Sequence, residues 1–245
     1  MPAHQTIRTI ALDMLQLIHY SLCPMSRSIR LAIGECGLVV ELEEERPWAW
    51  RRDFLMINPA GTLPVLMRPQ GFILSGYYAI SEYLDETHGK VNGEAPPRQL
   101  LFPGSSIERA EIRRLVDWFH VKMDQEATRY FLDERVFQRF TDMGRSTPDT
   151  DIIRAGRANL RYHLTYMAHL LEQREWLAGD VISFADLAAA GQLSVLDYLS
   201  EVPWDEFEKV KTWYQAMKAR DSFRPLLTDR LPGLPPPPVY AEVEF

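Results

Sequence analysis

The chain has 245 residues, of which 46% are hydrophobic and 25% are charged, a composition typical of a globular protein with one large domain or two small ones. Its formal net charge is −7, and no basic tract is visible, which argues against nucleic-acid binding through the phosphate backbone. The chain has only two cysteines, no signal-peptide pattern and no apolar stretch suited to membrane insertion. We therefore expect a cytoplasmic protein without a disulfide framework.

The first third of the chain alternates short β-like runs with helical ones. Residues 1–13 show no periodicity and are expected to form a flexible N-terminal extension. Within residues 14–89, β-like runs at 15–19, 39–43, 63–67 and 72–74 are separated by helical stretches, the first of which ends at Gly37. This order predicts a βαβ unit followed by a pair of strands and another helix, which together form an α/β domain.

The rest of the chain is helical up to a proline-rich end. Residues 90–104 are expected to be an interdomain linker, and 105–230 an all-α domain that opens with Ser105 and Glu108 as a capping box. Four consecutive prolines at 235–238 set apart a tail, 231–245, which we expect to be extended, to join no helix and to be dispensable for stability. The spacing of histidines and cysteines suggests no metal site.

Two motifs carry a resemblance to a known family. Residues 58–66 read NPAGTLPVL, and residues 177–186 contain LAGD followed by SFAD; both are similar to motifs of the glutathione S-transferase superfamily. The resemblance implies a thioredoxin-like domain followed by an all-helical one. It also implies a cis peptide bond before Pro64, main-chain contacts from Leu63 to glutathione, and an N-capping role for Ser183 and Asp186.

The junction after the first expected strand carries the candidate chemistry. Cys23-Pro24-Met25-Ser26 resembles the monothiol motif of glutaredoxins and omega-type transferases. At a helix N-terminus, with Arg27 and Arg30 one and two turns along, the Cys23 thiol is expected to have a lowered pKa and to be catalytic. Tyr20 or Ser21 are alternatives, because other transferase classes use a hydroxyl there.

One departure from the family pattern concerns the γ-glutamyl part of glutathione. Relatives carry an acidic residue and a serine where this chain has Gly76 and Tyr77, and Ser75 lies one residue too early. Loss of these hydrogen bonds predicts weaker glutathione binding, by about tenfold to a hundredfold for each bond. Backbone N–H groups near Gly76 are expected to remain open to a carboxylate. Glutathione is therefore a possible ligand but not a required cofactor.

A narrower resemblance points to a different kind of function. The segment 46–55 (RPWAWRRDFL) and the end of the chain are similar to those of glutathione S-transferase-like division regulators of alphaproteobacteria, which bind the tubulin-like protein FtsZ as dimers. The resemblance implies a homodimer that binds FtsZ polymers and inserts into no membrane. The expected contact residues are Trp48, Arg51, Arg52, Tyr240, Glu242, Glu244 and Phe245. The alternative is a glutathione-dependent thiol transferase that uses Cys23.

Overall fold

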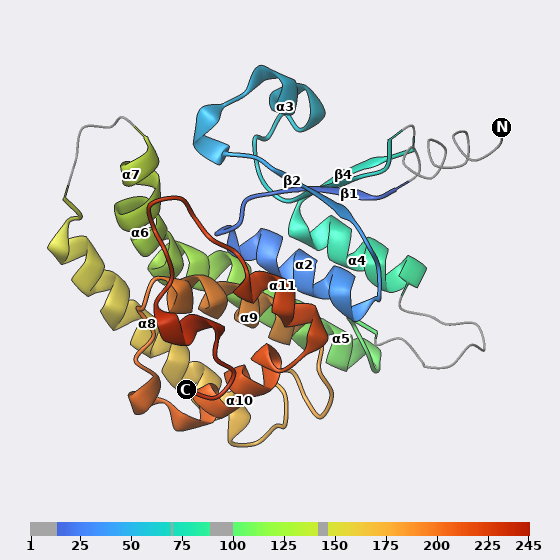
Figure 1. Ribbon diagram of the computed structural model, residues 1–245. Helices are drawn as coiled ribbons and strands as arrows, with labels where there is room; N and C mark the ends of the chain where they lie inside the picture. Colours follow the sequence, from blue (N-terminus) through green and yellow to red (C-terminus); the bar gives the residue numbers. More distant parts are fainter. Residues whose placement is uncertain (1–13, 70, 89–99, 142–146) are drawn as a thin grey trace.

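The computed structural model describes residues 14–69, 71–88, 100–141 and 147–245 (Figure 1). The predicted N-terminal extension, 1–13, and most of the predicted linker lie outside the described residues. Within the described residues, a small sheet with helices on both faces is followed by a larger group of helices, as the sequence predicted.

The described strands form one mixed sheet in the order β2-β1-β3-β4. Strands β1 and β2 pair in parallel, as a helical crossover between them requires, whereas β3 pairs antiparallel with β1 and with β4. The strands are β1 (Gln16–His19), β2 (Glu41–Glu44), β3 (Val65–Met67) and β4 (Ile73–Ser75). Each overlaps a predicted run, so the predicted thioredoxin-like topology is confirmed.

Helices α2 (Pro24–Glu35) and α4 (Tyr77–His88) cover one face of the sheet, and the short α3 (Arg52–Ile57) lies on the other (Figure 1). Proline at the first position of α2 suits a helix start, because its missing N–H would have no partner there. The helix stops before Gly37, whose φ of 65° is left-handed and favours glycine. A 3₁₀ turn, η1 (Pro47–Ala49), precedes α3.

The second domain opens with a helix that runs from Ser106 to Phe140 with two wider, π-helical stretches. Its successive parts are α5 (Ser106–Asp117), η2 (Trp118–Thr128), α6 (Arg129–Leu132), η3 (Asp133–Phe137) and α7 (Gln138–Phe140). The predicted capping box is present, since the Ser105 N–H donates to the Glu108 carboxylate and the Glu108 N–H donates to the Ser105 hydroxyl. The remaining helices are α8 (Thr150–Leu171), α9 (Phe184–Tyr198), α10 (Glu208–Lys218) and α11 (Arg224–Leu227), joined by the 3₁₀ turns η4 (Trp204–Glu206) and η5 (Asp221–Phe223).

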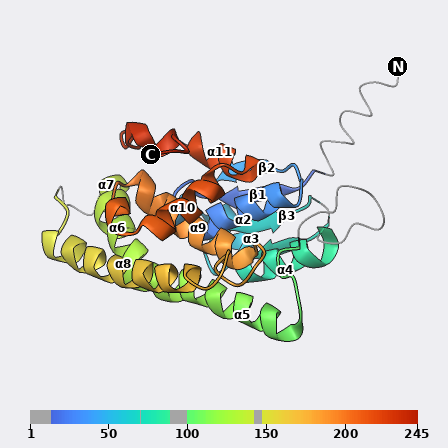
Figure 2. The same cartoon turned by 90° about the horizontal axis from the view of Figure 1, so that it is seen from below.

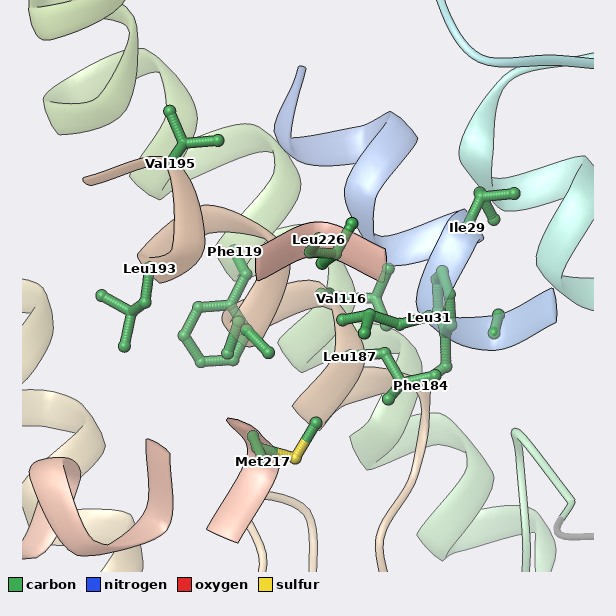
Figure 3. Close-up of a cluster of buried hydrophobic side chains, with 14 of the residues drawn as sticks. Ile29, Leu31, Val116, Phe119, Phe184, Leu187, Leu193, Val195, Met217 and Leu226 are labelled. Atoms are coloured by element: carbon green, nitrogen blue, oxygen red, sulfur yellow. The ribbon is translucent and has the colours of Figure 1, made fainter. Parts of the chain in front are cut away.

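The hydrophobic core is continuous across the two domains, because α2 packs along the wholly buried α9. Gly191 allows this approach: a Cβ there would lie 2.6 Å from the Pro24 carbonyl oxygen. Figure 3 shows side chains of α2 gathered with those of the long α5–α7 helix, α9, α10 and α11. The start of α9 is fixed by Asp186, which accepts hydrogen bonds from the Ser183 N–H, 3.0 Å, and the Trp213 indole, 3.1 Å. The predicted structural role of this motif is confirmed.

The C-terminal tail, which was predicted to be extended and to join no helix, packs at its end on the helical domain. It ends in a 3₁₀ turn, η6 (Pro238–Ala241), and the side chain of Tyr240 is fully buried. Figure 2 shows this red segment crossing the face of the molecule opposite α5 and α8. The prolines stiffen the segment but do not keep it in solvent, because an aromatic ring beyond them has a buried site to fill. No helix among the described residues is long and apolar enough to cross a membrane.

Candidate functional site

An aromatic cluster connects the junction between β1 and α2 with η1 and with the end of the long α5–α7 helix. Tyr20, which follows β1, lies edge-on to Trp48 of η1 with ring centroids 5.1 Å apart. Trp48 in turn contacts Phe137 at 5.3 Å and stacks on Phe140 at 6.1 Å, both from the end of the long helix. Rings from both domains therefore pack together next to the start of α2.

The Cys23 thiol does not have the predicted thiolate character. Cys23 precedes α2, but burial raises the pKa of its thiol, and this outweighs the hydrogen bonds from Ser26 that favour the thiolate. The predicted cationic partners face elsewhere: the Arg27 and Arg30 guanidinium groups form ion pairs with Asp229, at 3.2 and 2.8 Å. The prediction of a lowered pKa is wrong, because desolvation disfavours the thiolate and both guanidinium groups pair with Asp229, two residues beyond α11 (Arg224–Leu227).

The two alternative hydroxyls are also poorly suited to activate a thiol. Tyr20 is buried, and its hydroxyl has no hydrogen-bond partner within the described residues. Burial raises the pKa of Tyr20, so the phenolate is disfavoured. Ser21 is nearly buried, and its carbonyl oxygen accepts a 2.6 Å hydrogen bond from Arg27 Nε. The main chain at Ser21 is therefore engaged in holding the arginine.

The motif expected to contact glutathione through its main chain is in place. The Leu63–Pro64 peptide bond is cis, and both side chains are buried. Gly76 has a left-handed φ of 89°, and its N–H donates to the Pro64 carbonyl oxygen at 3.0 Å. This N–H is thus not open to an anion, contrary to expectation. Ser75 remains the last residue of β4, so it does not shift into the helix start.

Tyr77, at the position where relatives carry a serine, packs inward. Its ring lies 4.5 Å from that of His120, a buried histidine on η2. His120 Nε2 is 2.8 Å from the Ser28 hydroxyl of α2. The first turn of α4 contains no acidic residue, so it offers no carboxylate to a ligand's ammonium group. The chemistry of this corner therefore does not fit the γ-glutamyl end of glutathione.

The two tryptophans of the expected partner-binding segment face in different directions. Trp48 is half-buried in the aromatic cluster, whereas Trp50 is 67% exposed and Met56 of α3 is 77% exposed. Trp50 has a left-handed φ of 47°, which is costly for a bulky residue. Its ring lies over Gly61, where an added Cβ would be 3.2 Å from it. The sequence drew attention to Trp48, but nothing in the residue pattern distinguished the inward ring from the outward one.

The arginines beside these rings also differ. Arg51 is paired with Glu45, at 2.8 Å, and lies 3.8 Å from Glu43. Arg52 is exposed and forms no ion pair with another described residue. We call the exposed residues Trp50, Arg52 and Met56 the outer Trp50 surface. It combines apolar area with an exposed guanidinium group.

The tail residues divide in the same way. Tyr240, expected to be a partner contact, is instead buried against Tyr198, with ring centroids 5.3 Å apart. Phe245 is half-buried, with its ring 5.3 Å from that of Trp204 and 4.4 Å from the Lys218 ammonium nitrogen. Glu242 and Glu244 are exposed and remain accessible. Tyr240 is therefore wrong as an aromatic anchor for a partner, because its own domain uses the ring.

The fold and this site define a class of protein, and comparisons with known families name it. The family model for the glutathione S-transferase N-terminal domain matches residues 22–87, and that for the C-terminal domain matches residues 143–221. The chain belongs to the glutathione S-transferase family.

Individual relatives narrow this further. The chain is 41% identical over 232 residues, 94% of its length and 97% of the relative's, to FtsZ-localized protein A of Caulobacter vibrioides. The solved structure of FzlA from C. crescentus has a TM-score of 0.88 at 40% identity and covers 95% of this chain and all of the other. A glutathione S-transferase from Sinorhizobium meliloti has the same TM-score at 46% identity, with the same coverage.

Proposed function

We propose that this chain is a regulator of bacterial cell division that binds FtsZ polymers in the cytoplasm and does not depend on glutathione chemistry. The observation that carries the proposal is the outer Trp50 surface, an exposed aromatic ring in a costly backbone conformation next to an arginine that forms no ion pair with another described residue. Tryptophan and arginine are the residues most often found at the energetic centre of protein interfaces. The similarity to a relative named for its localisation with FtsZ supports FtsZ as the partner.

The catalytic alternative has less support from the same region. A thiol transferase requires an accessible thiolate, but desolvation raises the pKa of the half-buried Cys23 thiol, so the thiolate is disfavoured. An acidic residue for the ammonium group of glutathione is absent from the first turn of α4. We infer that glutathione is not required for the function of this chain.

We also propose that the protein acts as a homodimer, joined through the side that carries β4, α4 and α5. Exposed apolar residues lie on these elements, namely Ile73, Tyr78 and Ile107, with exposed fractions of 51%, 40% and 81%. A second copy would remove this area from water. The tail lies on the opposite face from α5 (Figure 2), so the exposed ends of both tails would stay accessible, and two linked sites bind a polymer more tightly than one. Sedimentation at micromolar concentrations should give a dimer.

Co-sedimentation with FtsZ polymers tests the binding proposal. Replacing Trp50 with Ala should weaken the association by about tenfold or more, the effect typical of an interface hot spot. Tyr162→Ala is the matched control, because Tyr162 is an aromatic residue of similar exposure, 55%, on α8. The control should bind as well as the unmodified protein. Equal binding by Trp50→Ala, with both variants folded, would refute the role of the outer Trp50 surface.

A further inference from the structure

One fully buried arginine joins three segments that are far apart in the sequence. Arg27 Nε donates to the Ser21 carbonyl oxygen at 2.6 Å, and Nη1 donates to the Ser194 carbonyl of α9 at 3.1 Å. Nη1 also donates to the Tyr240 hydroxyl at 2.8 Å, while Nη2 forms the ion pair with Asp229. The side chain has no exposed surface. A buried cation with several partners is costly to disturb, since any lost acceptor leaves an unsatisfied charge.

Through its bond to Ser21, Arg27 is connected to the segment that precedes the outer Trp50 surface. The Ser21 carbonyl that it holds directly follows Tyr20 in the chain, and the Tyr20 ring packs edge-on against Trp48. Trp48 belongs to η1, which ends immediately before Trp50. A shift of the main chain at Ser21 therefore moves a ring on which the Trp48 loop rests.

Through its bond to the Tyr240 hydroxyl, Arg27 is also connected to the tail. The Tyr240 hydroxyl accepts from Arg27 and donates to the Leu226 carbonyl oxygen at 3.1 Å. Tyr240 is part of η6, and the exposed Glu242 and Glu244 follow it directly. The hydroxyl thus fixes the position from which the acidic end of the tail projects.

We propose that Arg27 and Tyr240 are positioning residues that couple the C-terminal tail to the Trp48 loop, so that docking of the tail sets the geometry of the outer Trp50 surface. The coupling is a property of the folded chain alone, but its consequence for a partner rests on the proposed binding to FtsZ. The coupling follows from a chain of direct contacts with one charged group at its centre. The coupling predicts that binding of a partner to the tail changes the affinity of the outer Trp50 surface for that partner, and the reverse.

The test is Tyr240→Phe, which removes one oxygen and keeps the buried ring. Tyr198→Phe is the matched control: the Tyr198 hydroxyl also makes two hydrogen bonds to the tail region, from the Leu231 N–H at 2.9 Å and to the Leu234 carbonyl at 2.7 Å. The Tyr198 hydroxyl makes no bond to Arg27, and the ring face that Arg27 approaches, 5.8 Å from its centroid, is kept. Both variants loosen the tail, but only one breaks the link to Arg27.

Amide hydrogen exchange over residues 47–57, measured on the protein without any partner, reads out the coupling. Tyr240→Phe should speed exchange there by about tenfold, the effect of losing one hydrogen bond to a charged group. Tyr198→Phe should leave exchange in that segment unchanged while speeding it at residues 231–234. Equal acceleration of 47–57 by both variants, or acceleration by Tyr240→Phe confined to the tail, would overturn the proposal.

Co-sedimentation then separates this inference from the proposed function. If the coupling acts on binding, Tyr240→Phe should weaken association with FtsZ polymers about fivefold more than Tyr198→Phe does, a difference near 1 kcal/mol. If the unmodified protein fails to co-sediment, the proposed function is wrong, and the exchange experiment still decides the coupling. Exchange that responds as expected while both variants bind equally would refute the functional part of the coupling.

Discussion

The start of α2 and the C-terminal tail were both singled out by the sequence, and the structure reverses their expected characters. The Cys23 end of α2 was expected to present a reactive thiolate, yet burial raises its pKa. The tail was expected to be dispensable for stability and to offer Tyr240 to a partner, yet Tyr240 is buried. One cluster contributes to both outcomes, because Arg27 and Arg30 pair with Asp229 and Arg27 donates a hydrogen bond to the Tyr240 hydroxyl, while desolvation raises the pKa of Cys23.

The outcome at Cys23 shows which properties of a site can be predicted from residue spacing and which cannot. Arginines one and two turns beyond a cysteine can lower its pKa only if their charges face the sulfur. A carboxylate brought in from 199 residues along the chain competes for the same cations with bidentate geometry, at 2.8 and 3.0 Å from Arg30. The competitor is invisible in the local motif, so the motif alone cannot decide between a reactive thiol and a structural anchor.

Deleting residues 239–245 tests whether the tail contributes to the stability of the fold, and we expect it to have the largest effect on the free energy of unfolding. The deletion removes the buried Tyr240 ring and leaves Arg27 with one fewer acceptor, so the free energy of unfolding should fall by about 4 kcal/mol. The melting temperature should drop by roughly 10 °C. Thermal and urea unfolding measure this loss, and a melting temperature unchanged by the deletion would restore the view of the tail as a free arm.

Replacing Trp48 with Ala tests whether the aromatic cluster next to the start of α2 stabilises the fold. Loss of its contacts with Tyr20, Phe137 and Phe140 should cost about 3 kcal/mol of unfolding free energy. By contrast, Trp50→Gly should keep stability within about 1 kcal/mol of the unmodified protein, because relief of the left-handed backbone offsets the lost ring contacts. Urea titration of the two variants checks this, and similar losses in both would contradict opposite orientations for the two rings.

The free energy of unfolding should depend on pH through His120, which contacts Ser28 of α2. Burial lowers the pKa of His120 to about 3, so the folded state binds fewer protons than the unfolded state between this value and the ordinary value near 6.5. The stability that neutral His120 contributes is complete above that range and is lost as pH falls through it.

The measurement is urea unfolding of the unmodified protein and of His120→Gln at pH 7 and pH 5. The variant should lose about 2 kcal/mol less between the two pH values, since it has no buried imidazole to protonate. Asp186 acts in the opposite direction in both proteins, because burial raises its pKa to about 6, and it cancels in the comparison. Identical pH dependence of the two proteins would show that His120 is not desolvated in the folded state.

The fold could be predicted from the sequence because its signals are local. The strand runs, the breaker at Gly37 and the Ser105–Glu108 box each act within a few residues, and the structure places all of them as expected. The motif around Pro64 is likewise a continuous segment whose backbone geometry its own sequence determines.

The candidate site could not be predicted to the same extent because its properties depend on contacts between distant segments. The pKa of Cys23 depends on burial by another domain, and the orientation of Trp48 depends on Phe137 and Phe140, about ninety residues away. The exposure of Trp50 follows from that packing rather than from its neighbours in sequence. The lack of an acidic residue at positions 76 and 77 could be seen in the sequence itself, because recognising that a side chain is missing requires no knowledge of tertiary contacts.

The most direct test of the central claim, binding without thiol chemistry, is the affinity for FtsZ polymers of the unmodified protein and of Cys23→Ser, each with and without millimolar glutathione. The account predicts four dissociation constants that agree within about twofold, because the outer Trp50 surface includes neither Cys23 nor the Leu63–Pro64 segment expected to contact glutathione. A tenfold change caused by glutathione in the unmodified protein, and abolished by Cys23→Ser, would contradict the account and return Cys23 to the centre of the function.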